Sequence, residues 1–173
     1  IIMYNIVKRI IMDAMTVIHL SKITLLRSLV ENMEVVIPRK VFKESVKDSL
    51  GRYNDALITD GLIREGKIMV LDVNVDRIKE IERFGMTGGE AEAVALYLDG
   101  KYDAIASDDD VVRENRTLLN LKVIGTPSIV KWMFEEGIIA KKKAVEGLEE
   151  LKKISWFERG LLDRIIAEVE IDE

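Results

Sequence analysis

The sequence predicts an α/β protein, a three-layer sandwich in which helices cover both faces of a mostly parallel, five-stranded sheet. The first observation behind this fold class is a series of short apolar runs, rich in β-branched residues, with the length of strands buried on both faces. The second is that segments with helical periodicity lie between these runs. Alternation of strand and helix is typical of parallel strands that are joined by right-handed crossovers.

The expected strands are Val7–Met12, Glu34–Ile37, Lys67–Val73, Tyr102–Ala106 and the shorter Leu121–Ile124. The expected helices between and after them are Lys22–Glu31, Arg39–Ser49, Arg52–Glu65, Val75–Arg83, Gly89–Asp99 and Asp110–Leu119. Thr126 and Pro127 have the pattern of an N-cap and a first helical residue, so they predict a helix over Ser128–Glu136 that Gly137 ends. Two amphipathic helices follow, Lys141–Lys153 and Trp156–Val169, the second opened by a capping box of Ser155 and Glu158.

Length and composition indicate one compact domain with an appendage. At 173 residues the chain can bury one core, and we expect residues 1–140 to form the domain and residues 141–173 a helical extension packed on it. The chain has no cysteine, which excludes disulfides and thiolate metal sites. No apolar run reaches the roughly 20 residues of a membrane span, and the start lacks a signal-peptide pattern. We therefore expect a cytoplasmic protein.

Acidic residues follow several of the predicted strands. Asp13 ends the first apolar run, Asp108–Asp110 follow the fourth, Glu44 lies in the helix after the second, and Glu90 lies in the first turn of a glycine-led helix. Each has an ordinary explanation as a helix cap, a turn or a surface ion pair. However, the neighbours of Asp13 are apolar, so its carboxylate needs a partner. Because ligands bind beyond the carboxyl ends of parallel strands, we expect the acids to converge.

Converging carboxylates predict a divalent cation. Two carboxylates 4 Å apart repel by about 4 kcal/mol at an effective dielectric constant near 20, and a cation reverses the sign of this term. Oxygen ligands, without cysteine and with a single histidine in the chain, favour Mg²⁺ or Mn²⁺ over zinc. Such an ion commonly binds substrate phosphate, so the pattern indicates phosphoryl chemistry.

Two other phosphate-handling classes fit the sequence poorly. A haloacid-type phosphatase needs a second carboxylate where this chain has Met15. A receiver domain needs a further acid beside Asp13, which Met12 and Ala14 flank instead.

The order of these motifs resembles that of the PIN-domain nucleases, and most closely the prokaryotic branch that contains the VapC toxins. The resemblance covers about residues 7 to 137 and rests on Asp13 after a strand, on Glu44, and above all on two motifs, Gly89-Glu90-Ala91-Glu92-Ala93 and Ser107-Asp108-Asp109. Two positions depart from the family pattern. Ala14 and Met15 replace small polar residues, and Ser107 replaces threonine.

The resemblance implies a sheet ordered 3-2-1-4-5, Mg²⁺ or Mn²⁺ as cofactor, single-stranded RNA as substrate, homodimerisation, and a role as the toxin of a toxin–antitoxin pair. It implies that the acidic site comprises the catalytic residues Asp13, Glu44, Glu90 and Asp109. The expected metal ligands are Asp13, Glu90 and Asp109, with Asp108 sharing or replacing Asp109. The expected substrate-binding residues near the pocket mouth are Arg39, Lys43, Arg113 and Ser107.

The remaining polar and aromatic candidates have structural interpretations. His19 follows apolar residues and is expected to be packed and hydrogen-bonded, not catalytic. Trp132, Met133, Trp156 and Phe157 are expected in the core or an interface. The alternative function is a catalytically inactive PIN-fold binding or regulatory module. The presence of all four acids argues against it, while Ala14 and Met15 keep it open.

Overall fold

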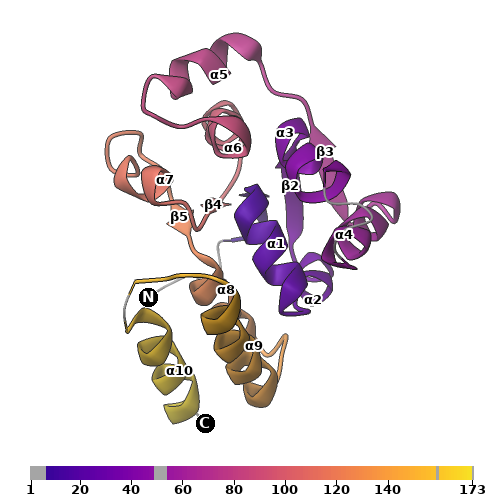
Figure 1. Cartoon of the computed structure of the whole chain (residues 1–173), viewed down its shortest axis with the longest axis vertical. Helices are drawn as coiled ribbons and strands as arrows, with labels where there is room; N and C mark the ends of the chain where they lie inside the picture. The colour runs from indigo at the N-terminus through magenta and orange to yellow at the C-terminus, as the bar shows by residue number, and fades with distance from the viewer. Residues whose placement is uncertain (1–6, 49–53, 159, 173) are drawn as a thin grey trace.

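The computed structural model describes residues 7–48, 54–158 and 160–172, and it contains one sheet of five parallel strands. The strands are β1 Arg9–Met12, β2 Glu34–Pro38, β3 Ile68–Leu71, β4 Ala104–Ala106 and β5 Val123–Ile124. Their order across the sheet is β3-β2-β1-β4-β5 (Figure 1). The fold class and the expected strand order are confirmed.

After the charged first residues Arg9 of β1 and Glu34 of β2, the central strands are apolar because both faces of the sheet are covered. In β1, Ile10 and Met12 belong to one apolar cluster and Ile11 to the other, as the period of two of a strand requires. The register pairs Ile11 with Val36 of β2 and with Ile105 of β4. Strand β1 is therefore buried on both faces and flanked on both edges, which fixes the position of the residue that follows it.

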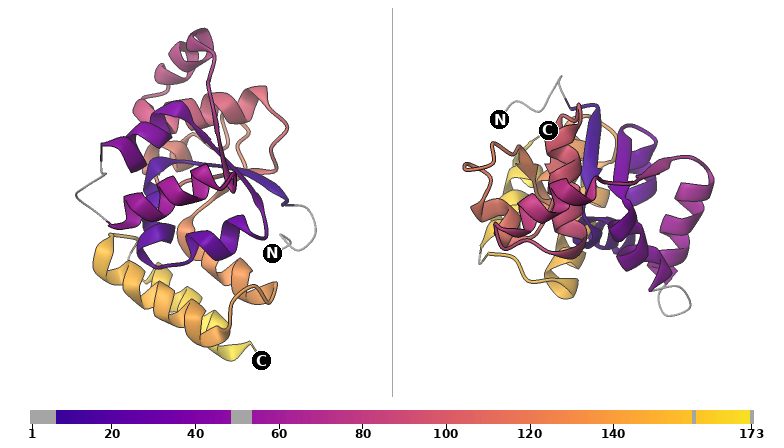
Figure 2. Two further views of the ribbon diagram at one scale, coloured as in Figure 1. Left: turned by 90° about the vertical axis from the view of Figure 1, so that its right-hand side faces the viewer. Right: turned by 90° about the horizontal axis from the view of Figure 1, so that it is seen from above.

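The helices form a layer on each face of the sheet (Figures 1 and 2). One face is covered by α5 Val75–Glu82, α6 Gly88–Asp99 and α7 Asp110–Glu114, whose apolar residues pack together. The other face is covered by the remaining helices, which share the second cluster. These are α1 Ala14–Lys22, α2 Leu26–Val30, α3 Arg39–Phe42, α4 Asn54–Arg64, α8 Thr126–Glu135, α9 Lys141–Ile154 and α10 Leu161–Ile171.

Several predicted helices differ from those in the structure. The segment predicted as Lys22–Glu31 is the end of α1 and a separate α2, because Thr24 adopts φ 61° between them. The helix predicted over Asp110–Leu119 ends at Glu114 and continues as turns up to Asn120, which also has a left-handed φ of 53°. The helix predicted from Trp156 begins at Leu161, after Gly160 with φ 83°, so Ser155 and Glu158 form no capping box there.

The segment predicted as a helix over Arg39–Ser49 is α3 followed by a π-helical turn, η1 Lys43–Lys47. Its widened turn closes with the Asp48 amide donating to the Lys43 carbonyl at 3.0 Å. Single π turns of this kind often occur at functional sites. Ser49, the predicted end of this helix, and Arg52, the predicted start of the next one, lie outside the described residues.

The C-terminal helices share the core of the sheet. Leu148 and Leu151 of α9 and Ile165 and Val169 of α10 are buried in the cluster that contains Ile10 and Met12. Helix α9 begins at Lys141, where the predicted extension starts. In the described part of the chain, no helix combines the length and the apolar composition that crossing a membrane requires.

Candidate metal centre

Asp13 lies at the carboxyl end of β1, where it forms the N-cap of α1. Its Oδ1 accepts a hydrogen bond from the Thr16 amide at 2.9 Å, and its Oδ2 accepts one from the Ser107 hydroxyl. The Asp13 amide donates to the carbonyl of Ala106 at 3.1 Å, which extends the pairing of β1 with β4. The residue is only 3% exposed. Asp13 is therefore held between the carboxyl ends of β1 and β4.

Asp109 lies three residues after the end of β4 and caps α7. Its Oδ1 accepts from the Val112 amide at 3.0 Å, and its own amide donates to the Ser107 hydroxyl oxygen at 3.2 Å. Ser107 thus bridges Asp13 and Asp109. Ser107 is buried, and its hydroxyl is engaged in these two bonds, so it positions the acids. It is not placed where it could contact substrate, which differs from the expected role.

Glu90 and Glu44 meet at the N-terminus of α6. Glu90 accepts from the Thr87 amide at 2.9 Å, so it is both a member of a capping box and a member of the acidic group. Glu44, from η1, accepts from the Gly89 amide at 3.2 Å. A Cβ at Gly89 would lie 2.5 Å from Glu44 Oε2. A side chain at residue 89 would therefore displace the Glu44 carboxylate from its present contact with the backbone of α6.

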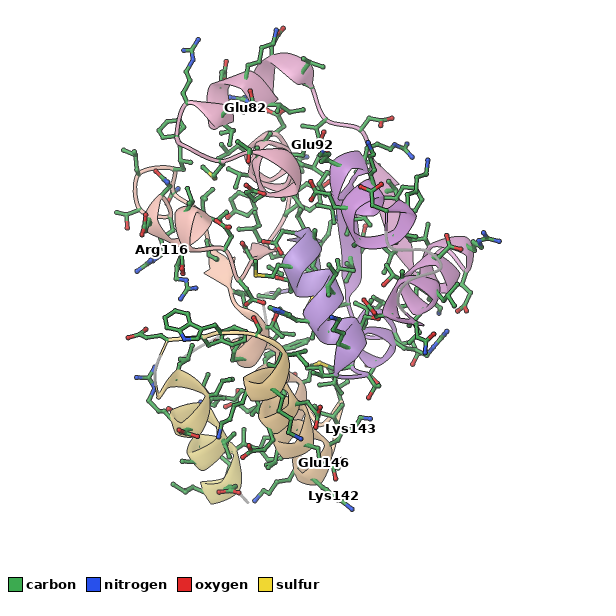
Figure 3. All side chains as sticks on the ribbon, in the orientation of Figure 1. Glu82, Glu92, Arg116, Lys142, Lys143 and Glu146 are labelled. Carbon is green, nitrogen blue, oxygen red and sulfur yellow. The ribbon has the colours of Figure 1, made fainter. Side chains whose placement is uncertain are left out.

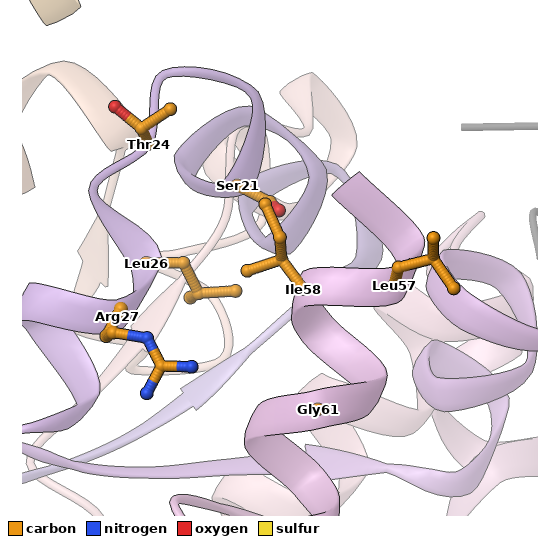
Figure 4. Close-up of a pocket in the computed structure, with 7 residues that line it drawn as sticks. All are labelled: Ser21, Thr24, Leu26, Arg27, Leu57, Ile58 and Gly61. Carbon is orange, nitrogen blue, oxygen red and sulfur yellow. The ribbon is translucent and has the colours of Figure 1, made fainter. Parts of the chain in front are cut away.

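The four acids line one cavity of about 170 Å³. The lining residues are Asp13, Ala14, Met15, Glu44, Glu90 and Asp109. The structure therefore brings together the four residues expected to be catalytic. A second cavity of about 280 Å³, between α4 and the α1–α2 turn, is lined mainly by apolar residues and contains no carboxylate (Figure 4).

The electrostatics of the cavity favour a positively charged ligand. Burial raises the pKa of Asp13 to about 6, although hydrogen bonds from Ser107 and Thr16 act in the opposite direction. Burial also raises the pKa of Glu44, and the charges of Glu90 and Glu92 add to this effect. The N-termini of α1, α6 and α7 point at the acids and offset part of their repulsion.

The donor set fits a hydrated divalent cation. The charged groups that line the cavity are carboxylates, whose oxygens suit Mg²⁺ or Mn²⁺. Across residues 7–48, 54–158 and 160–172, no three Asp, Glu, His or Cys side chains form a group that could hold an ion directly between them. Mg²⁺ commonly binds one or two carboxylates and keeps several of its waters.

Asp108 does not share the cavity with Asp109. Its Oδ1 accepts from the Thr126 amide at 2.7 Å, and its Oδ2 accepts from the Thr126 hydroxyl and faces His19 Nδ1 at 2.7 Å. The expectation that Asp108 binds the metal is not supported, because both of its oxygens are used elsewhere. His19 is buried and hydrogen-bonded, as predicted.

The three basic residues expected to bind substrate lie outside the cavity lining. Arg39 is exposed and forms an ion pair with Asp72, with 3.0 Å between Nε and Oδ1. Arg113 pairs with Asp110 at 3.0 Å, and Lys43 is exposed on η1 beside Glu44. Exposed ion pairs contribute little free energy, so both arginines can exchange their partners for a phosphate.

Glu92 has a role that the sequence did not reveal. It points from α6 to the start of α3, where it accepts from the Lys40 amide at 2.8 Å (Figure 3). No residue within α3 supplies this cap, because its N-cap is Pro38. The sequence shows only that α3 lacks an N-cap side chain of its own. It does not show that Glu92, from a helix far along the chain, accepts the hydrogen bond instead.

We expect Gly89→Ala to gain less stability than a substitution to alanine at an unconstrained helical glycine. Alanine is favoured over glycine in helices by about 1 kcal/mol, but a Cβ at residue 89 would also lie 3.0 Å from Val41 Cγ2. Gly61 of α4 is the matched control, since a Cβ there meets nothing within 4 Å. Urea unfolding should show Gly61→Ala more stable than Gly89→Ala, and the reverse order would contradict the tight contact at Gly89.

Comparison with known proteins gives one match. The family model DUF3368, described as a PIN domain, matches residues 9–170 and so includes α9 and nearly all of α10. Searches of curated proteins and of solved structures found no match.

Proposed function

Because this chain belongs to the PIN-domain family, we propose that it is a metal-dependent endoribonuclease that cleaves single-stranded RNA. The family match supports a nuclease-type fold that generally works with a divalent metal. The observation that carries the proposal for this chain is the convergence of Asp13, Glu44, Glu90 and Asp109 on one cavity. These acids come from four separate segments, and each is held by a backbone amide.

Asp13, Glu90 and Asp109 would hold Mg²⁺ or Mn²⁺. When bound, the cation would supply a water of lowered pKa and positive charge for the oxygens that enter and leave phosphorus. Ser107 and Thr16 orient the Asp13 carboxylate for this task. Glu44, whose pKa is raised mainly by burial, is the carboxylate suited to accept a proton from the attacking water. Arg39, Lys43 and Arg113 would bind flanking phosphates.

The second candidate function is a catalytically inactive binding or regulatory module. The observation in its favour is that Ala14 and Met15 line the cavity, where they offer no hydroxyl or amide to water or substrate. Met15 is 43% exposed, so the cavity is open to solvent beside it. Homodimerisation, recognition by an antitoxin and a toxin role follow only from the resemblance to the VapC branch, and they stay predictions.

The first test compares two glutamates of α6. Glu90→Gln should reduce Mn²⁺-dependent cleavage of a fluorescent single-stranded RNA by roughly 100-fold or more, since a metal site contributes several kcal/mol to transition-state stabilisation. Gln preserves the bond from the Thr87 amide, so the fold should survive.

Glu92→Gln is the matched control for this test. Its Oε1 can still accept from the Lys40 amide, and Glu92 does not line the cavity. Activity should stay within about threefold of wild type, which is close to the size of an ordinary surface effect. Loss of cleavage in Glu92→Gln but not in Glu90→Gln would contradict the proposed site, and a wild-type protein that never cleaves RNA would favour the inactive module.

A further inference from the structure

Three donors converge on the buried carboxylate of Asp108. The Thr126 amide donates to Oδ1, and the Thr126 hydroxyl and His19 Nδ1 approach Oδ2. An ionised carboxylate only accepts, so His19 carries its proton on Nδ1. The side chains of Asp108 and His19 are 3% and 8% exposed. We call His19, Asp108 and Thr126 the Asp108 clamp.

The clamp joins α1, α8 and the loop that follows β4. His19 lies on α1, the helix that Asp13 caps, and Thr126 is the first residue of α8. Asp108 lies between two residues of the site, because Ser107 binds Asp13 and Asp109 lines the cavity. Fixing the Asp108 side chain therefore fixes the chain on both sides of it.

The local structure is shaped for this contact. A Cβ at Gly125 would lie 3.2 Å from Asp108 Oδ1, so glycine gives the carboxylate room to reach the N-terminus of α8. A buried carboxylate is tolerated only when its oxygens are satisfied, and loss of one donor leaves part of the charge uncompensated. The loop that carries Asp109 is consequently held in one arrangement.

The C-terminal helices reach this clamp through Phe157. Its ring packs against His19 with the two ring centroids 5.7 Å apart and the planes tilted by 52°. Phe157 lies in the connection between α9 and α10. The preceding residue, Trp156, is 84% exposed, so of the two expected positions, core or interface, the core is excluded for Trp156.

We propose that His19, Thr126 and Phe157 are positioning residues, which hold Asp109 at the cavity by fixing Asp108. The catalytic part of this inference rests on the proposed nuclease function. The C-terminal extension then contributes to the geometry of the site, because Phe157 keeps the His19 ring against Asp108. The nearby acids do the chemistry, and these three residues set their spacing.

The first experiment removes one hydroxyl from the clamp. Thr126→Val keeps the size of the side chain but loses its bond to Asp108, whereas Thr126→Ser restores a hydroxyl. Thr59→Val is the matched control, since Thr59 is equally buried and its hydroxyl donates to the Asp55 carbonyl within α4. His19→Asn should act as a second rescue, because its amide nitrogen can take the place of Nδ1, while His19→Leu cannot donate.

Two measurements that need no RNA report whether the Asp108 clamp holds Asp109 in place. Amide hydrogen exchange measured by NMR should be faster at Asp109 and Val112 in Thr126→Val than in Thr59→Val, because those amides bond to Ser107 and Asp109. Calorimetric titration with Mn²⁺ alone should show about 10- to 100-fold weaker binding, the usual effect of losing a group that orients a metal ligand. Thr126→Ser should restore both.

Activity then separates positioning from a general loss of stability. In Thr126→Val, kcat should fall by about 10- to 100-fold while the KM for RNA changes little. Equal amide exchange in Thr126→Val and Thr59→Val would overturn the clamp, whatever the activity. A wild-type protein that neither binds Mn²⁺ nor cleaves RNA would overturn the proposed function, and the exchange comparison would still decide whether the clamp holds Asp109.

The role of the extension is tested by two neighbouring aromatic residues. Phe157→Ala removes the ring that covers His19, and it should raise exchange at Asp109 and Val112 in the same direction as Thr126→Val. Trp156→Ala is the control, because that side chain is exposed. Identical exchange at these two amides in the Phe157 and Trp156 variants would show that the extension does not act through His19.

Discussion

Asp13→Asn should abolish RNA cleavage and, at pH 7 without metal, make the protein more stable than wild type. Both effects have one cause, a carboxylate placed where its charge is unfavourable until a cation binds. Burial raises its pKa to about 6 from an ordinary value of 3.8. The folded protein therefore binds a proton at Asp13 more tightly than the unfolded chain does, and an amide mimics the neutral form.

The sign of the pH dependence follows from this difference. The contribution of neutral Asp13 to the free energy of unfolding is fully present below about pH 4 and is lost as the pH rises through about 6. The free energy of unfolding of the wild type should therefore fall across that pH range relative to that of Asp13→Asn. The full difference between the two pKa values corresponds to at most about 3 kcal/mol at pH 7. Hydrogen bonds that asparagine makes less well will reduce this gain.

Urea unfolding in EDTA at several pH values measures the effect directly. Asp72→Asn is a control of opposite sign, because Arg39 lowers the pKa of that exposed carboxyl. Mn²⁺ at 100 times its dissociation constant should stabilise wild type by about 2.7 kcal/mol, and Asp13→Asn by much less. An Asp13→Asn protein that is less stable than wild type in EDTA at pH 7 would contradict a repulsive, cation-binding site.

The convergence of Asp13 and Asp109 was predictable from sequence because both residues follow the ends of strands. Asp13 and Asp109 follow neighbouring parallel strands, whose carboxyl ends lie at the same edge of the sheet. The strand order, which the resemblance implied, was also correct. Glu90 was recognised both as a capping residue and as a site residue, and the structure shows that one carboxylate can cap the helix and line the cavity.

The division of labour between Asp108 and Asp109 could not be predicted. Adjacent residues after a strand point in different directions, and which one faces the cavity depends on partners distant in the chain. His19 and Thr126 supply those partners for Asp108, and neither carries a local signal of this role. The π turn at Glu44 and the late start of α10 likewise depend on packing, which overrides local periodicity.

The ends that cleavage leaves on RNA should distinguish the proposed mechanism from the main alternative. An enzyme that uses the 2′-hydroxyl as nucleophile normally needs a general base and a general acid, most often histidines, and it leaves a cyclic phosphate. The only histidine of this chain is His19, which is buried and engaged with Asp108. Water activated at an acidic metal site attacks phosphorus directly, and the 3′-oxygen leaves.

We therefore expect 5′-phosphate and 3′-hydroxyl ends, formed only with a divalent cation. An RNA with a single 2′-deoxy nucleotide at the scissile position is the matched substrate, because it removes the internal nucleophile and leaves water attack possible. It should be cleaved at a comparable rate, and His19→Asn should give the same ends. Mass spectrometry that finds 2′,3′-cyclic phosphate, or a deoxy substrate that is not cleaved, would indicate attack by the 2′-hydroxyl, and activity that persists in EDTA would show that no divalent cation is needed. Each result would contradict attack by metal-activated water at the acidic cavity.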